Sequence, residues 1–265
     1  MLTDEQLLRY SRQIMLPGLD VSGQESLARA RVLLVGLGGL GSACAQYLAG
    51  AGVGALWLAD GDSVELSNLP RQVLHDESRL GRNKAESAAR TLGRLNSSVD
   101  IRVLPRRLGA DDLPVLCRQV DIVVDATDNF ATRCALNQAC VDSRRPLVSA
   151  AAIRLEGQLA VFDTARGGPC YRCLYPDALD DSAMSCSENG VLGPAVAVLG
   201  ALQALEAIKY LTGLAPPLHE GVLLVDLARL EFNRLALRRR PDCPVCADAP
   251  VQPGSARLGA GGPIR

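Results

Sequence analysis

The sequence predicts an α/β protein with a Rossmann-like, mostly parallel sheet and a mixed or antiparallel C-terminal extension. Three observations lead to this fold class. In the first 150 residues, short apolar runs alternate with helix-like segments, which is the pattern of β-α-β units. A glycine-rich turn with Gly36, Gly38 and Gly41 follows the first apolar run. In the second half the apolar runs no longer alternate with helices, which favours a different strand pairing there.

The expected elements follow from these runs. Residues 1–30 should form helices, because Leu7, Leu8 and Ile14 can share one face. Parallel strands are expected near residues 31–35, 55–59, 100–104, 121–125 and 146–149. Three later strands are expected at residues 158–162, 222–225 and 231–235.

Residues 191–211 are the most apolar stretch of the chain. Pro194 and the polar residues Gln203, Glu206 and Lys209 interrupt it at helical spacing. This pattern favours a buried or interface helix over a membrane span. Lys209 is expected to be a surface residue whose apolar stem covers its neighbours.

Length and composition predict one domain. The chain has 265 residues, 48% of them hydrophobic, which suffices for a large core over residues 1–246. Residues 247–265 should be a disordered tail, because they are rich in Gly, Pro and Ala without periodicity. A net charge of −1 points to no nucleic-acid or membrane partner. The acidic, polar start differs from a signal peptide, so we expect a cytoplasmic protein.

Residues 31–60 have the pattern of a nucleotide-binding β-α-β unit. Gly36 should allow a tight turn, Gly38 a close approach of phosphates, and Gly41 the packing of the helix on the sheet. The helix N-terminus would offer N–H groups and a positive dipole end to an anion. Asp60 ends the second strand, where an acidic residue usually takes ribose hydroxyls.

Polar residues after the second and fourth strands complete a candidate site. Asn68, Arg71 and Lys84 follow the second strand, and Asp128 follows the fourth. Ligands of open α/β sheets lie at the edge where these strands end. Two cations suit a triphosphate better than a nicotinamide dinucleotide, and a facing carboxylate suits Mg²⁺. The alternative for Asp128 is a turn or helix cap.

Other polar residues give weaker signals. Asp62 suits either a supporting acid at the site or a turn residue. His75 and His219 are isolated histidines without partner spacing, so the sequence assigns neither a role.

Cysteines predict a metal site. Two CxxC pairs, Cys170 with Cys173 and Cys243 with Cys246, are separated by 69 residues. Four thiolates form a closed tetrahedral Zn²⁺ site, so the metal would be structural. Disulfides are the alternative, but no secretory signal accompanies them and cytosolic thiols stay reduced. Four further cysteines fall in helix-like segments, so we expect them to pack as small buried hydrophobic residues: Cys44, Cys117, Cys134 and Cys140.

Together, these motifs resemble the MoeB/ThiF family of adenylyltransferases, bacterial relatives of ubiquitin-activating enzymes. The matching segments are RYSRQI, VGLGGLGS, LADGDSVELSNLPRQ, GRNKAESA, ATDN, the loop near Cys186 and the two CxxC pairs. The match extends from about Leu7 to Cys246, nearly the whole chain. The set in this order is far more specific than any one member.

The resemblance implies an ATP- and Mg²⁺-dependent enzyme that adenylates the C-terminal glycine of a small ubiquitin-like sulfur carrier. This carrier would end in Gly-Gly, be of the molybdopterin-synthase small-subunit type, and go on to thiocarboxylation. The family's nucleotide residues correspond to Gly39, Asp60, Ser67, Asn68, Arg71, Lys84, Asp128 and Asn129. Its zinc ligands correspond to Cys170, Cys173, Cys243 and Cys246. Positioning and charge neutralisation, which cations and Mg²⁺ supply, are what phosphoryl chemistry requires.

The resemblance also implies a homodimer. Arg12 matches an arginine that reaches the nucleotide of the neighbouring subunit, so Arg12, Arg71, Lys84 and Asp128 are the expected catalytic residues. Pro70 is a departure, because proline has no N–H for a nucleotide contact. No rhodanese domain follows Cys246, so we expect a separate sulfur donor. Cys186 matches a cysteine that is linked covalently to the carrier in the ThiF branch.

Three alternatives stay open at this point. A ThiF-like adenylyltransferase would serve thiazole or another thiocarboxylate pathway. An NAD-dependent oxidoreductase is disfavoured by Arg71, Lys84 and Asp128, and by the lack of an evident catalytic His or Tyr-Lys pair. A non-catalytic scaffold for a ubiquitin-like partner is disfavoured by the intact set of nucleotide residues.

Overall fold

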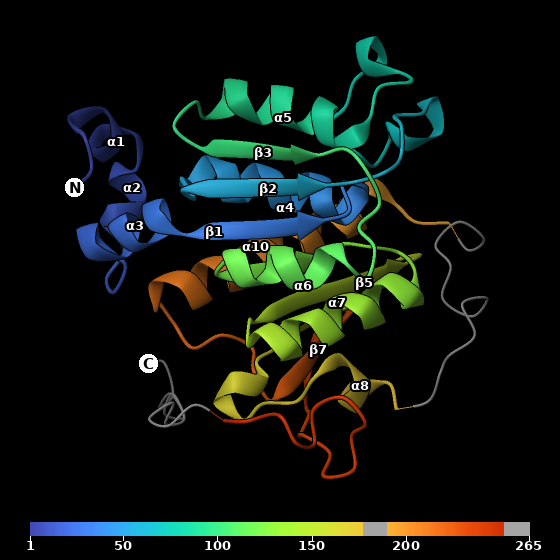
Figure 1. The fold of residues 1–265 in the computed structure, drawn as a ribbon. Coiled ribbons are helices and arrows are strands. Elements are labelled where there is room, and N and C mark those ends of the chain that lie inside the picture. The colour runs from blue at the N-terminus through green and yellow to red at the C-terminus, as the bar shows by residue number, and fades with distance from the viewer. Residues whose placement is uncertain (177–189, 252–265) are drawn as a thin grey trace.

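A computed structural model describes residues 1–176 and 190–251. Its centre is an eight-stranded sheet with the order β3-β2-β1-β4-β5-β6-β7-β8 (Figure 1). The five parallel strands are β1 (Arg31–Val35), β2 (Ala55–Ala59), β3 (Asp100–Leu104), β4 (Ile122–Asp125) and β5 (Leu147–Ile153). The antiparallel extension consists of β6 (Glu156–Phe162), β7 (Gly221–Asp226) and β8 (Glu231–Ala236). The predicted fold class is therefore confirmed.

Strand β5 is longer than the expected 146–149. It continues through small alanines to Ile153 and turns into β6, with which it pairs antiparallel from Leu147↔Phe162 to Ile153↔Glu156. Arg154 has a φ of 53°, the left-handed conformation that this short connection requires. Alanine has a low strand propensity, which is why the sequence pattern underestimates the strand.

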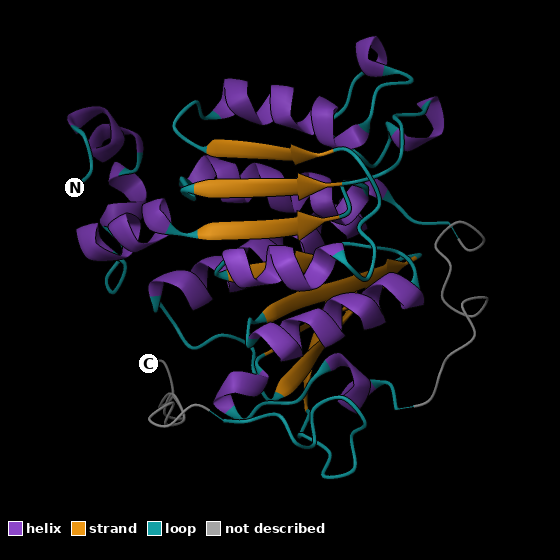
Figure 2. Cartoon of the chain, in the orientation of Figure 1, coloured by secondary structure: helices purple, strands orange, loops and turns teal. Residues whose placement is uncertain are grey.

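Helices cover both faces of the sheet (Figure 2). On one face, α4 (Gly39–Ala51), α5 (Lys84–Leu95) and α10 (Gly193–Thr212) enclose one hydrophobic core. On the other, α6 (Asp112–Gln119), α7 (Phe130–Ser143) and α8 (Tyr171–Leu174) enclose a second. Cys44, Cys117 and Cys140 are buried in these cores, as expected, and Cys134 is partly buried. The short 3-10 helices are η1 (Leu66–Asn68), η2 (Glu77–Arg79) and η3 (Thr164–Arg166).

Helix α10 is long and apolar enough, by length and composition, to cross a membrane. In the fold it packs instead against β5, β6 and α4, as the interrupted pattern predicts. Its buried Gln203 donates hydrogen bonds to the carbonyl groups of Asp125 and Val148. The expectation for Lys209 is wrong: its ammonium group pairs with Glu206, which is 6% exposed. The second Glu206 oxygen accepts the N–H of Leu218 at 2.6 Å, so the pair ties α10 to the loop before β7.

The expected N-terminal helices are α1 (Asp4–Arg9), α2 (Ser11–Ile14) and α3 (Asp20–Arg29). They lie where the parallel strands begin, at the end opposite to the arrowheads (Figure 1). Tyr10 anchors them, because it is 2% exposed and its hydroxyl group accepts a hydrogen bond from Asn96 at 2.8 Å. Gln13 adds a hydrogen bond to the Ala51 carbonyl group at the end of α4.

The expected tail begins at residue 247. Ala247 and Ala249 donate backbone hydrogen bonds to the carbonyl groups of Cys243 and Cys246, and Ala249 packs on the cysteine cluster. Residues 252–265 lie outside the described residues.

The packing of α4 against the glycine turn can be tested at Gly41, with a loosely packed glycine of α5 as the control. A Cβ atom on Gly41 would lie 1.9 Å from the carbonyl oxygen of Gly36, whereas one on Gly93 in α5 meets nothing within 4 Å. We expect Gly41→Ala to lower the free energy of unfolding by about 2 kcal/mol or more. Gly93→Ala, the matched control, should raise it by roughly 0.5–1 kcal/mol. Chemical denaturation checks both values, and similar effects for the two variants would contradict this packing argument.

Candidate functional site

The candidate site lies at the carboxyl ends of β1 and β4. These strands are neighbours, and the sheet order reverses between them, because β2 lies on the other side of β1 and β5 on the other side of β4. Such a switch point leaves a crevice at the sheet edge, where ligands of open α/β sheets bind. The glycine turn after β1 and the polar residues after β4 therefore meet in space, as predicted.

The glycine turn has the geometry of an anion site. Gly36 has a φ of 91°, and a Cβ atom there would lie 2.6 Å from the Ala126 carbonyl oxygen. Gly38 is the N-cap of α4 and makes no side-chain cap hydrogen bond. The N–H groups of the first helical turn therefore have no capping side chain. The atom nearest to a Cβ on Gly38 would be the Gln72 amide nitrogen at 3.7 Å, which leaves room for a ligand. Gly39 instead packs against Val196 of α10.

Asp60 fixes the glycine turn from the end of β2. One carboxylate oxygen accepts the N–H of Leu37 at 2.7 Å, and the other accepts the N–H of Asp62 at 2.8 Å. Burial raises the pKa of Asp60, and the two N–H groups and the charge of Lys84 oppose this shift. The sequence predicted a ribose ligand here, and the structure adds that the same carboxylate orders the glycine loop.

Lys84 begins α5 and is 7% exposed. Its ammonium group lies 3.3 Å from the carboxylate of Asp62, which also accepts a hydrogen bond from Arg107 at 3.1 Å. Burial opposes the shift, but the hydrogen bond from Arg107 and the charge of Lys84 lower the pKa of Asp62. Asp62 is therefore a counter-ion of the cation predicted to bind phosphate, which decides between its two sequence-based interpretations.

The loop after β2 contributes buried amides. Asn68 and Gln72 are 7% and 3% exposed, and their amide oxygens have no hydrogen-bond partner among the described residues. Orphaned buried oxygens beside a phosphate-type loop fit a polar ligand that supplies donors. Arg71 donates to the Ser67 carbonyl group at 2.9 Å, so its guanidinium group lies across this loop. The hydroxyl group of Ser67 donates to Glu65.

Asp128 is exposed at the carboxyl edge of β4, and the residue after it, Asn129, is the one that caps α7. Asn129 is the N-cap of α7, and its side-chain oxygen accepts the N–H of Thr132 at 2.9 Å. The cap that sequence reasoning offered as an alternative for Asp128 therefore falls on Asn129.

The sequence analysis assigned no role to three buried polar residues. Asp125 is fully buried, and its carboxylate accepts the N–H and hydroxyl of Thr127 and the hydroxyl of Ser149. Arg133, 3% exposed, donates to the Thr127 carbonyl group at 2.6 Å. His75, 6% exposed, contacts the glycine loop. The contacts of Arg133 and His75 are made to backbone carbonyl groups, and the bond from Ser149 to Asp125 joins residues far apart in the sequence, so no spacing pattern reveals them.

Arg12 is not brought to this site. It lies exposed in α2, at the edge where the parallel strands begin, while the site lies at the edge where they end (Figure 1). Cys186, which matches the linking cysteine of the ThiF branch, lies outside the described residues.

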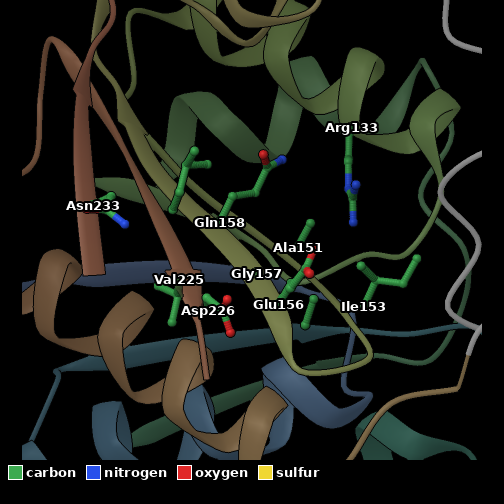
Figure 3. A pocket seen from close by; sticks show the side chains of 11 residues that line it. Arg133, Ala151, Ile153, Glu156, Gly157, Gln158, Val225, Asp226 and Asn233 are labelled. Carbon is green, nitrogen blue, oxygen red and sulfur yellow. The ribbon is translucent and has the colours of Figure 1, made fainter. Parts of the chain in front are cut away.

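A pocket of about 310 Å³ opens beside the site, between β6, β7 and α7. Small residues such as Ala151 and Gly157 form its floor, and Arg133 points toward it from α7 (Figure 3). Glu156 and Asp226 lie at its other end. Arg133, which lines the pocket, also donates to the carbonyl group of Thr127, the residue before Asp128.

The second centre is a cysteine cluster. The four sulfur atoms of Cys170, Cys173, Cys243 and Cys246 lie within 4.8 Å of one another, and all four side chains are buried. The Cys170–Cys243 and Cys173–Cys246 sulfur distances are 3.6 and 3.4 Å, far longer than a disulfide bond. They approach the separation of about 3.8 Å in a tetrahedral zinc–thiolate site. The cluster therefore fits one Zn²⁺ ion, as the spacing predicted.

Backbone and arginine contacts support this cluster. The N–H of Arg240 donates to the Cys173 sulfur at 3.4 Å. Bonds from Cys170 and from this N–H lower the pKa of the Cys173 thiol to about 4, against the effect of burial. Arg239 donates to the carbonyl groups of residues 246, 247 and 249.

Comparisons with known proteins match this picture. The model of the ThiF family matches residues 10–245. The molybdopterin-synthase adenylyltransferase of Escherichia coli (strain K12) is 47% identical over 245 residues, 92% of this chain and 98% of the relative. The adenylyltransferase and sulfurtransferase MOCS3 of Mus musculus is 51% identical over 252 residues, 94% of this chain and 55% of the relative. The chain thus spans about half the length of the MOCS3 relative.

Solved structures share the fold. A crystal structure of E. coli MccB with MccA-N7isoASN has a TM-score of 0.80 and 26% identity, and the alignment covers 93% of this chain and 76% of that one. A crystal structure of E. coli MccB with ATP has a TM-score of 0.78 and 26% identity, and covers 91% and 75%. Because the family model spans most of the sequence and the E. coli relative is matched over nearly its whole length, this chain belongs to the ThiF family.

Proposed function

We propose that this protein uses ATP to adenylate the C-terminal glycine of a small ubiquitin-like sulfur carrier of the molybdopterin-synthase small-subunit type. The observation that carries the proposal is the sheet edge, where the glycine turn lies against the loop of Arg71 and the segment before Asp128, and where Lys84 lies near Asp60. The name of the E. coli relative supports this activity. The MccB structure with ATP supports ATP as the nucleotide.

In this proposal the triphosphate lies against the N-terminal amides of α4, where the helix dipole favours negative charge. Lys84 and Arg71 supply positive charge, and Asp60 takes the ribose hydroxyls. Asp128 holds Mg²⁺, which neutralises phosphate charge when bound.

The reaction is an in-line displacement at phosphorus. A carboxylate oxygen of the terminal glycine attacks the α-phosphorus, and the bond from this phosphorus to the oxygen that bridges to the β-phosphate breaks. Pyrophosphate leaves, and the carrier is left as an acyl-adenylate. Sulfide-level sulfur from a separate donor then attacks the acyl carbon, the bond from this carbon to the AMP oxygen breaks, AMP leaves, and the carrier ends in a thiocarboxylate.

The carrier's C-terminus suits the pocket beside β6. Small residues such as Ala151 and Gly157 line this pocket, which leaves room for a polypeptide end beside Arg133. A Gly-Gly end carries no side chains and would fit such a space. Arg133 offers positive charge for the terminal carboxylate next to the Asp128 loop. Leu224 and Leu235, exposed on the same face of β7 and β8, offer apolar surface for the body of the carrier.

We further propose a homodimer in which Arg12 serves the site of the neighbouring chain. Arg12 lies at the opposite edge from the site of its own chain, so only a second copy can bring it to a nucleotide. Exposed apolar residues surround it in the N-terminal segment, with Leu8 78% and Met15 71% exposed. Such residues suit an interface that excludes water.

The cysteine cluster is proposed as a structural zinc site, since four thiolates leave no open coordination position. Reduced thiolates and the absence of a disulfide among the described cysteines suit a cytoplasmic location.

The first prediction tests the activity. The protein should catalyse exchange of labelled pyrophosphate into ATP only when a carrier ending in Gly-Gly is present, because adenylation is reversible until sulfur is added. A carrier without its last two glycines is the control, and a thiazole-pathway carrier distinguishes the ThiF-like alternative. Exchange without any carrier, or none with either carrier, contradicts the proposal.

The second prediction concerns the metal. Elemental analysis should find one zinc per chain, and Cys173→Ser should remove it and lower the unfolding temperature by about 10 °C. Cys134→Ser, outside the cluster, should retain the zinc. Protein that contains no zinc when freshly purified under reducing conditions would rule out this assignment.

The third prediction tests Arg12 in trans. Arg12→Ala and Asp128→Ala should each be folded and inactive, because each removes charge that compensates the phosphates. After subunit exchange in an equal mixture, about a quarter of the sites carry both groups intact if Arg12 acts across a two-fold dimer. The exchange assay should then recover that fraction of activity. Confirmed subunit exchange without any recovery means that Arg12 does not act on the neighbouring site.

A further inference from the structure

His75 connects two elements of the nucleotide site. Its imidazole ring is buried and has hydrogen-bond partners in both the glycine loop and α5. Nε2 lies 3.1 Å from the carbonyl oxygen of Leu37, in the turn between Gly36 and Gly38. Nδ1 lies 2.9 Å from the hydroxyl oxygen of Ser87, one turn after Lys84 in α5.

The chemistry of these partners fixes the form of the ring. Burial lowers the pKa of His75, so the imidazole is neutral at neutral pH and has one donor and one acceptor nitrogen. A carbonyl oxygen can only accept, so Nε2 carries the hydrogen and donates to Leu37. Nδ1 then accepts the hydroxyl hydrogen of Ser87. Both ring nitrogens are thus satisfied, and each bond has one direction.

Neighbouring bonds make the segment around His75 rigid relative to α5. Thr91 donates to the carbonyl oxygen of Leu74 at 2.8 Å, and Arg79 donates to that of Ser87 at 2.9 Å. The other side of the glycine loop is held by Asp60, which accepts the N–H of Leu37. Leu37 is therefore fixed through both of its backbone polar groups, and His75 is the one that links it to the helix of Lys84.

We propose that His75 is a positioning residue for ATP, which sets the separation between the amides of the glycine turn and the ammonium group of Lys84. The inference rests on the proposed function, since it names a residue that prepares the same triphosphate site. A triphosphate must contact both elements at once, so a loop that moves relative to α5 binds it less tightly. His75 itself touches no substrate; it acts through Leu37 and Ser87.

Three variants test this role. His75→Phe keeps a planar ring but removes the hydrogen bonds to the Ser87 hydroxyl group and to the Leu37 carbonyl group, which keeps only the longer 3.4 Å bond from Ser42 within α4. His75→Gln retains a side-chain amide that can donate to Leu37. Tyr210→Phe is the matched control, because it removes another hydrogen bond of a half-buried side chain, the 2.6 Å bond from Tyr210 to Asp163, at a distance from the sheet edge.

Calorimetric titration with ATP and Mg²⁺ gives the first readout. The Kd of His75→Phe should rise about tenfold, and that of His75→Gln should return to within about threefold of the unchanged protein. Tyr210→Phe should bind ATP as the unchanged protein does, even where its unfolding temperature falls. Equal ATP affinity in His75→Phe and the unchanged protein overturns the inference, as does a comparable loss in Tyr210→Phe.

Amide hydrogen exchange without nucleotide gives a readout that does not depend on the proposed function. In His75→Phe, peptides that cover residues 36–42 should exchange about tenfold faster, while His75→Gln and Tyr210→Phe should not change them. Unchanged exchange at residues 36–42 in a folded His75→Phe overturns the inference. An unchanged protein that binds no ATP contradicts the proposed function, and the exchange data then decide separately whether His75 orders the loop.

Discussion

The close approach of α4 to the turn that precedes it is the constraint on which the site depends. The Cβ position of Gly41 lies 1.9 Å from the Gly36 carbonyl oxygen, so the helix can begin this close to β1 only without a side chain there. This brings the N-terminal amides of α4 to the carboxyl edge of the sheet, where the dipoles of the helix add to one another. Asp60 then holds the turn in place through the N–H of Leu37. An anion site results from backbone geometry, before any cation is added.

The change from parallel to antiparallel pairing gives the sheet a second exposed region, at β7 and β8. Parallel strands need helical crossovers, which cover both faces of the sheet from β3 to β5. Among the described residues, β8 is exposed along its whole length, and a pocket lies beside Arg133 of α7. The pairing changes at β5, the neighbour of β4, and Arg133 of the pocket donates to the carbonyl group of Thr127, which precedes Asp128. In the proposed function, this arrangement would let a nucleotide and a polypeptide end meet at one edge.

The sequence predicted the strands and the gathering of Lys84, Asn68 and Asp128, because apolar runs mark buried strands and the ends of parallel strands share an edge. It did not predict how these groups are held. His75 and Arg133 bind backbone carbonyl groups, which every residue carries, so no sequence pattern marks them. Lys209 was misjudged because its partner, Glu206, is buried by a contact with the loop before β7. Burial of a charged pair depends on tertiary packing, to which helical spacing gives no access.

Packed helices connect the buried cysteine cluster with the exposed sheet edge at Asp128. The cysteine cluster fixes α8, and the N–H of Tyr171 in α8 donates to Asn137 in α7 at 2.8 Å. The ring of Tyr171 also lies 6.0 Å from that of Phe130, the first residue of α7. The N-cap of α7 is Asn129, the residue that follows Asp128. A metal bound by the cluster would thus stabilise the helix whose N-terminus carries the acidic loop, without taking part in the proposed reaction. Stability and reactivity are separated in this fold because a closed thiolate site offers no coordination position to a substrate, while the exposed carboxylate of Asp128 contributes little to packing.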